Sequence, residues 1–182
     1  MKIKLQNVRL SFPHLFQAQA NADGGQAKFN ASFLIPKSDK QIKMIEDAIV
    51  AVAKEKWGAK ADAVLKQLRA SDKVALHDGD TKAQYAGYEG CMFISASNAT
   101  RPLVLDRDKS PLTEEDGKPY SGCYVNATVE IWAQDNSYGK RINAGLGGVQ
   151  FAKDGDRFGG GTSADESDFE ELEAGADADD LV

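Results

Sequence analysis

The chain has 182 residues, of which 42% are hydrophobic and 27% are charged, and its formal net charge is -6. This composition fits one globular domain, because single hydrophobic cores commonly span about 100 to 200 residues. It excludes a membrane-spanning helix, since no stretch approaches the roughly 20 apolar residues that cross a bilayer. The alternating N-terminus also lacks the apolar core of a secretory signal. We therefore expect a cytosolic protein.

Acidic residues are concentrated at the C-terminal end of the chain. From Ser163 onward there are nine acids and no Lys or Arg, which leaves 19 acids against 22 bases in residues 1–162. The nine acids are Asp165, Glu166, Asp168, Glu170, Glu171, Glu173, Asp177, Asp179 and Asp180. The body of the protein therefore carries about three net positive charges, although the whole chain is acidic.

The N-terminal part of the chain predicts two paired strands. Residues 2–12 alternate apolar and polar side chains, with an irregularity at Gln6 and Asn7 that is typical of a β-bulge. We expect this strand to end at Pro13. A second alternating run over residues 27–35 follows a Gly-containing loop. Together the two runs indicate an antiparallel pair.

Helical spacing of apolar residues follows the second strand. Ser38 and Gln41 form the pattern of a capping box, and the apolar residues after them predict a helix over residues 38–57. A shorter helix is predicted over residues 61–69. We expect these helices to form one insertion, over about residues 38–69, that covers the sheet.

The pattern then returns to strands and sets the fold class. The predicted strands are residues 74–76, 91–96, 103–105, 122–132 and 141–151. The longest of them alternates a core face with a wet face. Five or six strands with one helical insertion predict a mainly β domain, and a small closed antiparallel barrel fits better than a parallel α/β sheet. The pattern alone leaves a small sandwich open.

The last part of the chain is too poor in core-forming residues to fold. Phe158 is followed by three glycines and then by the acidic run. Such a composition cannot bury enough apolar surface to offset the entropy of ordering the chain. We therefore expect a folded domain over residues 1–158 and a disordered tail over residues 159–182.

Signatures of catalysis and of metal or cofactor binding are weak. His14 and His77 are isolated, and Cys91 and Cys123 stand far apart, whereas zinc sites need clustered ligands. The paired aspartates at residues 78, 80, 106 and 108 could hold a divalent ion, but such pairs usually belong to turns. We expect no enzyme activity, no metal and no cofactor.

Basic and aromatic residues occur together on the predicted wet strands and loops. In a groove for single-stranded nucleic acid, cations track the phosphates while aromatic rings stack on the bases. The candidate phosphate contacts are Lys28, Lys82, Arg101, Arg107, Lys140 and Arg141, and the candidate stacking residues are Tyr85, Tyr88, Tyr120, Tyr124 and Tyr138. The alternative is a solvated basic rim around a core, and we assign Phe29, Phe33 and Phe93 to the core.

The acidic tail strengthens the nucleic-acid interpretation. A polyanion tethered to a basic groove can compete with DNA as an intramolecular ligand, because tethering raises its local concentration. Phe169, Leu172 and the terminal Leu181 and Val182 give the tail apolar anchors for docking onto other proteins. The alternative is that the tail only aids solubility.

Six segments of the chain have a distinctive sequence: VRLSFPHLF at residues 8–16, FNASFLIP at 29–36, DGD at 78–80, YEG at 88–90, YSGCYVNATVEIWA at 120–133 and GLGGVQFAKDGDRFGG at 145–160. With these segments the chain resembles the phage-encoded single-stranded-DNA-binding proteins that have an OB fold and an acidic C-terminal tail. The resemblance implies an OB-fold barrel that binds single strands without sequence preference in the cytoplasm of an infected bacterium. It also implies a role in phage DNA replication or recombination, with partner proteins recruited through the tail.

Two points of this interpretation stay open. Some phage proteins of this kind end in an aromatic residue, whereas this chain ends in Leu181 and Val182, so partner docking through the last residue is in doubt. The oligomeric state is also open, a homodimer included. Two other classes of function are a DNA-independent scaffold or virion protein whose tail binds basic partners, and an enzyme with a dispersed active site.

Overall fold

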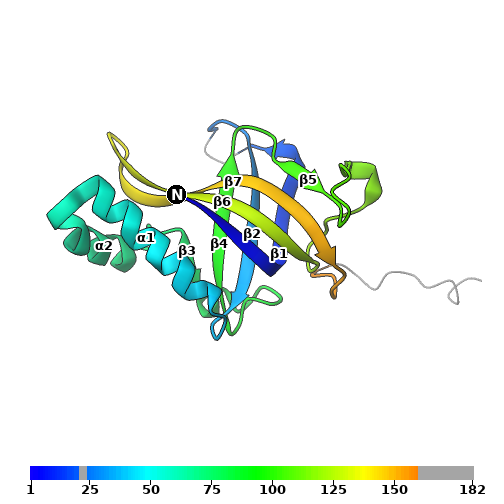
Figure 1. Ribbon diagram of the computed structural model, residues 1–182, viewed down its shortest axis with the longest axis horizontal. Coiled ribbons are helices and arrows are strands. Elements are labelled where there is room, and N and C mark those ends of the chain that lie inside the picture. Colours follow the sequence, from blue (N-terminus) through cyan, green and yellow to red (C-terminus); the bar gives the residue numbers. More distant parts are fainter. Residues whose placement is uncertain (21–23, 160–182) are drawn as a thin grey trace, which may run out of the picture.

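A computed structural model describes residues 1–20 and 24–159 of the chain (Figure 1). The strands are β1 (Lys2–Gln19), β2 (Lys28–Pro36), β3 (Leu76–Asp78), β4 (Cys91–Asn98), β5 (Leu103–Leu105), β6 (Tyr124–Asn136) and β7 (Gly139–Lys153). The helices are α1 (Gln41–Trp57) and α2 (Ala61–Ala70), joined by a short 3-10 turn. No helix among these described residues is both long and apolar enough to cross a membrane.

Five of the strands close into a barrel. The sheet order is β3-β4-β2-β1-β6-β7-β5, and an additional parallel pairing of Ser97 with Gly145 joins β4 to β7. The strands β1, β2, β4, β7 and β6 therefore form a closed ring, which is the arrangement of an OB fold. The predicted fold class, a mainly β barrel with a helical insertion, is confirmed. The predicted disordered tail lies outside the described residues.

Strand alternation places the core inside the barrel. On β6 the side chains of Val125, Ala127, Val129 and Ile131 are buried, as the alternation of this segment predicts. They pack with buried side chains from the other barrel strands, including the fully buried Phe33 of β2. The outer face of the same strands stays wet and is free to carry a binding surface.

The first strand is longer than predicted. It continues past Pro13 to Gln19, so the expectation that Pro13 ends it is wrong. The pairing of β1 with β2 shifts register between Ser11 and His14, and Phe12 has a φ of 46°. A proline has no N–H to give to the sheet, and a bulge tolerates that loss. The strand therefore bends at this point rather than stopping.

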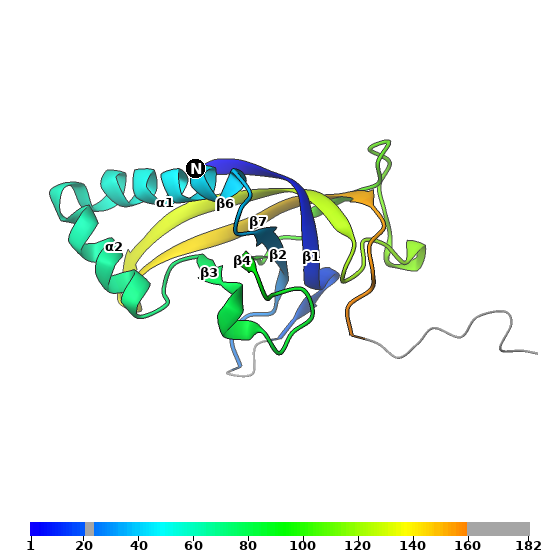
Figure 2. The ribbon, with the colours of Figure 1, turned by 90° about the horizontal axis from the view of Figure 1, so that it is seen from below.

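The helical insertion lies between β2 and β3 and covers one end of the barrel (Figure 2). Ile45 and Ile49 of α1 are fully buried in the barrel core. The predicted capping box is wrong, because α1 begins at Gln41 and its first N–H donates to the carboxylate of Asp39 at 2.9 Å rather than to Ser38. The side chain of Gln41 instead donates to the carbonyl of Gln6 at 2.9 Å, which ties the start of α1 to the first bulge of β1.

Candidate nucleic-acid interface

A polar hollow lies on the outside of the barrel, where β2, β3 and β4 face the hairpin of β6 and β7. It encloses about 370 Å³ and is lined by Lys28, Val74, Ala75, His77, Ser95, Ser97, Trp132, Gln134, Arg141, Ile142, Asn143 and Ala144. The small hydroxyl side chains of β4 leave space over the strand, and both fully charged side chains in the lining are positive. The hollow therefore suits a flat, anionic ligand.

Strand alternation places the lining residues on the outer face. On β4 the side chains of Ile94 and Ala96 are buried in the barrel, so Ser95 between them faces outward. On β6, Ile131 is buried and the next residue, Trp132, is 43% exposed. An indole ring with this exposure can stack on a base while its other face stays packed on the protein.

An aromatic depression lies on the outside of the barrel beside β1. It is lined by Phe12, Lys82, Tyr85, Tyr88 and Phe93 and encloses about 300 Å³. The rings of Phe12 and Tyr85 meet edge to face with centroids 5.1 Å apart, and both are about half exposed, at 50% and 43%. Exposed aromatic rings grouped in this way beside a lysine are the ingredients of a stacking platform for bases.

The bend in β1 creates part of this depression. Phe12 sits at the register shift of β1 with a φ of 46°, a region that bulky residues rarely adopt. Such backbone outliers cluster at binding sites, where the surrounding structure holds them. The consequence of the bend is that the Phe12 ring leaves the core and faces Tyr85.

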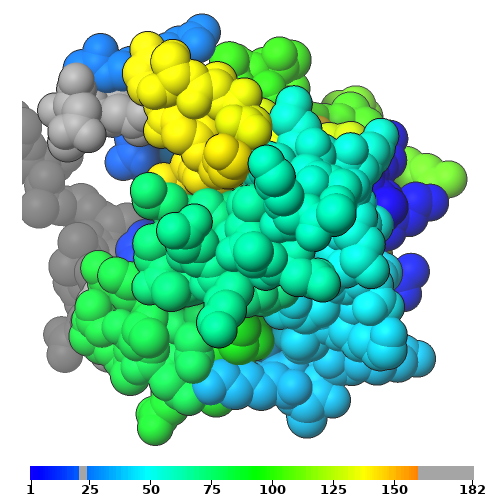
Figure 3. Space-filling view, turned by 90° about the vertical axis from the view of Figure 1, so that its left-hand side faces the viewer, coloured from blue at the N-terminus to red at the C-terminus, as the bar shows by residue number. Residues whose placement is uncertain are grey.

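One aromatic contact joins the hollow to the depression. His77 on β3 and Phe93 on β4 stack with their centroids 5.0 Å apart and their planes 27° apart. His77 lines the hollow and Phe93 lines the depression. We call the combined surface, from Tyr85 through the His77–Phe93 stack to Trp132, the aromatic path. In Figure 3, the segment that follows β3 (green) and the β6–β7 hairpin (yellow) appear on the two sides of the helices.

A charged bracket holds the loop of residues 79–90 that carries Tyr85. Lys37 at the end of β2 forms ion pairs with Asp78, at 2.8 Å, and with Asp80. The side-chain hydrogen bond from Lys37 lowers the pKa of Asp78, and the Gly90 N–H that donates to Asp80 lowers the pKa of Asp80. The two carboxylates thus anchor the loop to the end of β2.

Residues 1–20 and 24–159 contain no cluster of acidic, cysteine or histidine side chains that could hold a metal ion.

Five of the predicted binding residues line the hollow or the depression. Lys28 and Arg141 line the hollow, and Lys82 and Tyr85 line the depression. Tyr88 is also there, but its side chain is only 3% exposed and its hydroxyl donates to Ser11 at 3.2 Å. Tyr88 therefore supports the exposed rings from beneath rather than offering a free face.

Two further predicted residues lie at the hairpin between β6 and β7. Tyr138 is 90% exposed at the tip, and Lys140 lies 3.7 Å from the carboxylate of Asp135. Asp135 also accepts a hydrogen bond of 2.9 Å from the indole N–H of Trp57, at the end of α1. The helical insertion thus props the hairpin beside the hollow.

The other two predicted tyrosines are engaged at the opposite end of β6. The hydroxyl of Tyr120 donates to Asp154 at 2.6 Å, and the Arg157 guanidinium lies 4.5 Å from its ring centroid. The ring of Tyr124 lies 4.5 Å from the ammonium of Lys153. Neither tyrosine lines the hollow or the depression, and their role in binding stays a prediction.

The two remaining arginines lie on loops away from the aromatic path. Arg101, before β5, has its guanidinium 5.9 Å from the ring of Phe16. Arg107 follows β5, and its carbonyl accepts a hydrogen bond from Gln150. Both side chains are exposed, so they could extend a basic track, but neither belongs to the lining.

Four aromatic side chains in the two linings were not among the sequence candidates: Phe12, His77, Phe93 and Trp132. Trp132 carried a usable signal, because it falls on the wet face of the longest alternating strand. Phe93 was assigned to the core, and it is indeed buried, at 8% exposure, but in a small hydrophobic cluster with Leu34 and Tyr88 that is separate from the main core. Phe12 lines the depression only because β1 bends there, which the sequence pattern did not indicate.

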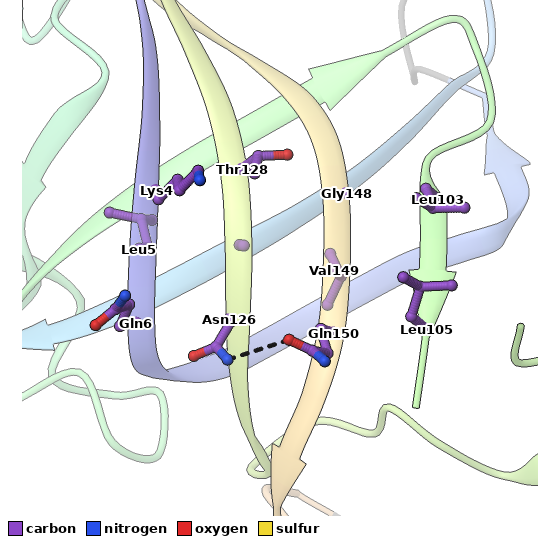
Figure 4. Close-up of a pocket in the computed structure, with 11 residues that line it drawn as sticks. Lys4, Leu5, Gln6, Leu103, Leu105, Asn126, Thr128, Gly148, Val149 and Gln150 are labelled. Atoms are coloured by element: carbon purple, nitrogen blue, oxygen red, sulfur yellow. Dashed lines mark hydrogen bonds between the residues drawn. The ribbon is translucent and has the colours of Figure 1, made fainter. Parts of the chain in front are cut away.

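Another hollow lies at the opposite end of β6 and β7 and has a different character (Figure 4). It encloses about 290 Å³ between β5 and the outer faces of β1, β6 and β7. Leu103 and Leu105 form one wall, and Asn126 donates to Gln150 across the other side at 3.3 Å. Of the described residues that line it, Lys4 is the one cation and none is aromatic. This hollow therefore lacks the several cations and the stacking rings that a groove for single-stranded nucleic acid needs.

The acidic tail residues and Phe169 lie outside the described residues. The chain that leads to the tail is described, and its last ring, Phe158, packs against Leu34 and Tyr88 beside the aromatic depression. The tail therefore begins next to one end of the aromatic path.

Comparisons with known proteins give a consistent result. A family described as "Enterobacter phage Enc34, ssDNA-binding protein" matches residues 1–182. The chain is 50% identical, over 175 residues and 94% of both chains, to "Putative protein p50" of Acyrthosiphon pisum secondary endosymbiont phage 1. A solved structure of the single-stranded DNA-binding protein of bacteriophage Enc34 in complex with ssDNA is 32% identical, with a TM-score of 0.74 over 87% of this chain and 89% of that one. The gp2.5 protein of bacteriophage T7, 12% identical, shares the fold with a TM-score of 0.58 over 94% and 98% of the two chains.

Proposed function

The chain belongs to the family of phage single-stranded-DNA-binding proteins represented by that of Enterobacter phage Enc34, and we propose that it binds single-stranded DNA along the aromatic path. The observation that carries this proposal is the His77–Phe93 stack, which makes the basic hollow and the aromatic depression one continuous surface. A family member of known structure binds ssDNA, and the aromatic path offers this chain a place to do the same.

The chemistry of the path supports binding without sequence preference. Lys28, Lys82 and Arg141 can neutralise phosphates, while Tyr85 and Trp132 can stack on bases. Every base has an aromatic face, so stacking of this kind tolerates any sequence. The protein then coats single strands and protects them inside the infected cell, during replication or recombination of phage DNA. Its function is binding rather than catalysis.

The tail regulates this binding in our proposal. Its nine acids compete with DNA for the cations of the path, and its position after Phe158 lets it reach the depression first. A flexible tail of about 20 residues has a root-mean-square reach of roughly 25 Å, which covers a barrel of this size. When DNA displaces the tail, the tail becomes free to dock onto replication or recombination proteins.

The test is binding of a fluorescent oligo-dT to the intact chain and to a chain ending at Thr162. We expect both to bind, and the shortened chain to bind more tightly because it has lost the competing anion. If about four phosphates are neutralised, affinity should fall roughly 50-fold between about 50 and about 200 mM salt.

The outcomes separate the parts of the proposal. Equal affinity of the two chains would remove the competing tail and keep the groove. Affinity that ignores salt would contradict the phosphate contacts. An absence of binding by both chains would favour a DNA-independent scaffold or virion protein whose tail binds basic partners.

A further inference from the structure

The segment of residues 154–158 runs from the end of β7 across one end of the barrel, and we call it the strap. Tyr120 donates to Asp154 at 2.6 Å, and the strap's last N–H, that of Phe158, donates to the carbonyl of Ser121 at 3.0 Å. A Cβ added at Gly122 would overlap the carbonyl of Asp156, so the strap lies directly on the backbone there. The strap is therefore a fixed part of the domain.

Arg9 of β1 fastens the strap at its far end. Its guanidinium donates to the carbonyl of Gly122 at 3.0 Å and to that of Asp156 at 2.8 Å. The same guanidinium lies over the ring of Phe158, 4.1 Å from its centroid. Two hydrogen bonds and a cation–π contact thus converge on one side chain, and they fix where the Phe158 ring lies.

The Phe158 ring packs against the loop of residues 79–90. A Cβ added at Gly87 would overlap this ring, and Gly87 has a φ of 85°, so the glycine is needed both for the space and for the turn. The ring also packs on the cluster of Leu34 and Tyr88. Gly87 lies two residues after Tyr85, whose exposed ring forms the outer wall of the aromatic depression.

We infer that Phe158 is a positioning residue for single-stranded DNA binding: it holds the turn at Gly87 and thereby presents the ring of Tyr85 to the DNA. The inference rests on the proposed function and deepens it. The charged bracket at Lys37 holds the loop from the Asp78 side, and Phe158 holds it at Gly87. Without Phe158, the half of the loop that carries Tyr85 loses its support.

The first test measures the loop without DNA. Hydrogen exchange of the backbone amides of Tyr85, Tyr88 and Cys91, which donate to carbonyls within this loop, is compared in the full chain and in its Phe158→Ala variant. We expect faster exchange in the variant at these amides and unchanged exchange in β6. Phe169→Ala, the same change in the tail, is the control and should leave the loop as it is. Unchanged exchange in Phe158→Ala would overturn the inference whether or not the protein binds DNA.

The second test is a pair of double-mutant cycles with oligo-dT, using the full-length protein. Loss of one stacking ring lowers affinity by about fivefold or more, so Tyr85→Ala should bind oligo-dT at least about fivefold more weakly than the unaltered chain. Phe158→Ala should bind it at least about threefold more weakly. Because Phe158 acts through Tyr85, the Tyr85→Ala, Phe158→Ala double variant should bind within about twofold of Tyr85→Ala alone. The effects of Phe158→Ala and Tyr138→Ala, at the distant hairpin tip, should multiply.

The cycles distinguish positioning from a general loss of structure. Losses that multiply in both cycles would mean that Phe158 does not act through Tyr85, and would overturn the inference. If Phe158→Ala unfolds, which circular dichroism reveals, Phe158→Leu serves in the same cycles, because it keeps apolar bulk and loses the ring. Failure of the unaltered chain to bind oligo-dT overturns the proposed function instead, and hydrogen exchange then decides whether Phe158 holds the loop.

Discussion

Replacing Trp132 tests the hollow directly. Its ring is 43% exposed at the wall of the hollow, so it offers one face to one base. One base stacked on an aromatic side chain contributes about 1 to 3 kcal/mol, so Trp132→Ala should weaken oligo-dT binding by roughly 5- to 150-fold. The other tryptophan, Trp57, donates to Asp135 and lies outside the lining.

The two tryptophans of the chain make a fluorescence assay possible. Because a stacked base quenches an indole, oligo-dT should quench the protein's emission through Trp132. The quenching should vanish in Trp132→Phe and persist in Trp57→Phe, which is the matched control. Quenching that survives in Trp132→Phe, or an affinity of Trp132→Ala within about twofold of the unaltered chain, would refute the placement of DNA in the hollow.

Three further results are expected. Arg141→Gln should reduce the slope of log affinity against log salt by about 0.7, whereas Lys54→Gln on α1 should leave it unchanged, as titrations at several salt concentrations would show. Burial raises the pKa of the Cys123 thiol to about 11, while the thiol of the unfolded chain ionises near pH 8.5. The free energy of unfolding should therefore be highest below about pH 8.5 and fall as the pH rises to about 11, because only the unfolded thiol ionises in that range. The Tm of Cys123→Ala should fall less over the same range than the Tm of the unaltered chain. Phe33→Ala, at a fully buried site, should lower the free energy of unfolding by about 3 to 5 kcal/mol in a urea titration; a smaller change would mean that the core collapses around the cavity.

The sequence predicted the fold correctly where a single local pattern, such as the alternation of apolar and polar residues in a strand, determines the structure. The alternation along β6 has a period of two, and the buried set Val125 to Ile131 follows from it. The prediction failed at Pro13, where the rule that proline ends a strand competes with the ability of a bulge to absorb it. It failed also at the start of α1, where Gln41 bonds to Gln6 instead of completing a cap.

The binding surface was less predictable than the fold because it depends on contacts between distant residues. Tyr85 and Tyr120 look alike in the sequence, each beside a lysine-containing turn. The structure separates them, because the Tyr120 hydroxyl donates to Asp154, 34 residues away, while the Tyr85 ring meets that of Phe12 on the outside of the barrel. A single sequence contains the residue types of a stacking surface, but it does not reveal which rings the fold leaves free.

The closure of the barrel has a mechanical consequence. In the described chain, β4 and β7 are joined by one backbone bridge, Ser97 to Gly145, and by the side chain of Asn98, which donates to the carbonyl of Leu146 at 3.0 Å. The neighbouring strand pairs share long ladders, so this seam is the weakest line in the wall of the barrel. The hollow straddles the seam, with Ser97 on one side and Asn143 on the other. If DNA binds in the hollow as we propose, it contacts both β4 and β7 and should restrain the barrel at the place where these two strands share the fewest backbone hydrogen bonds.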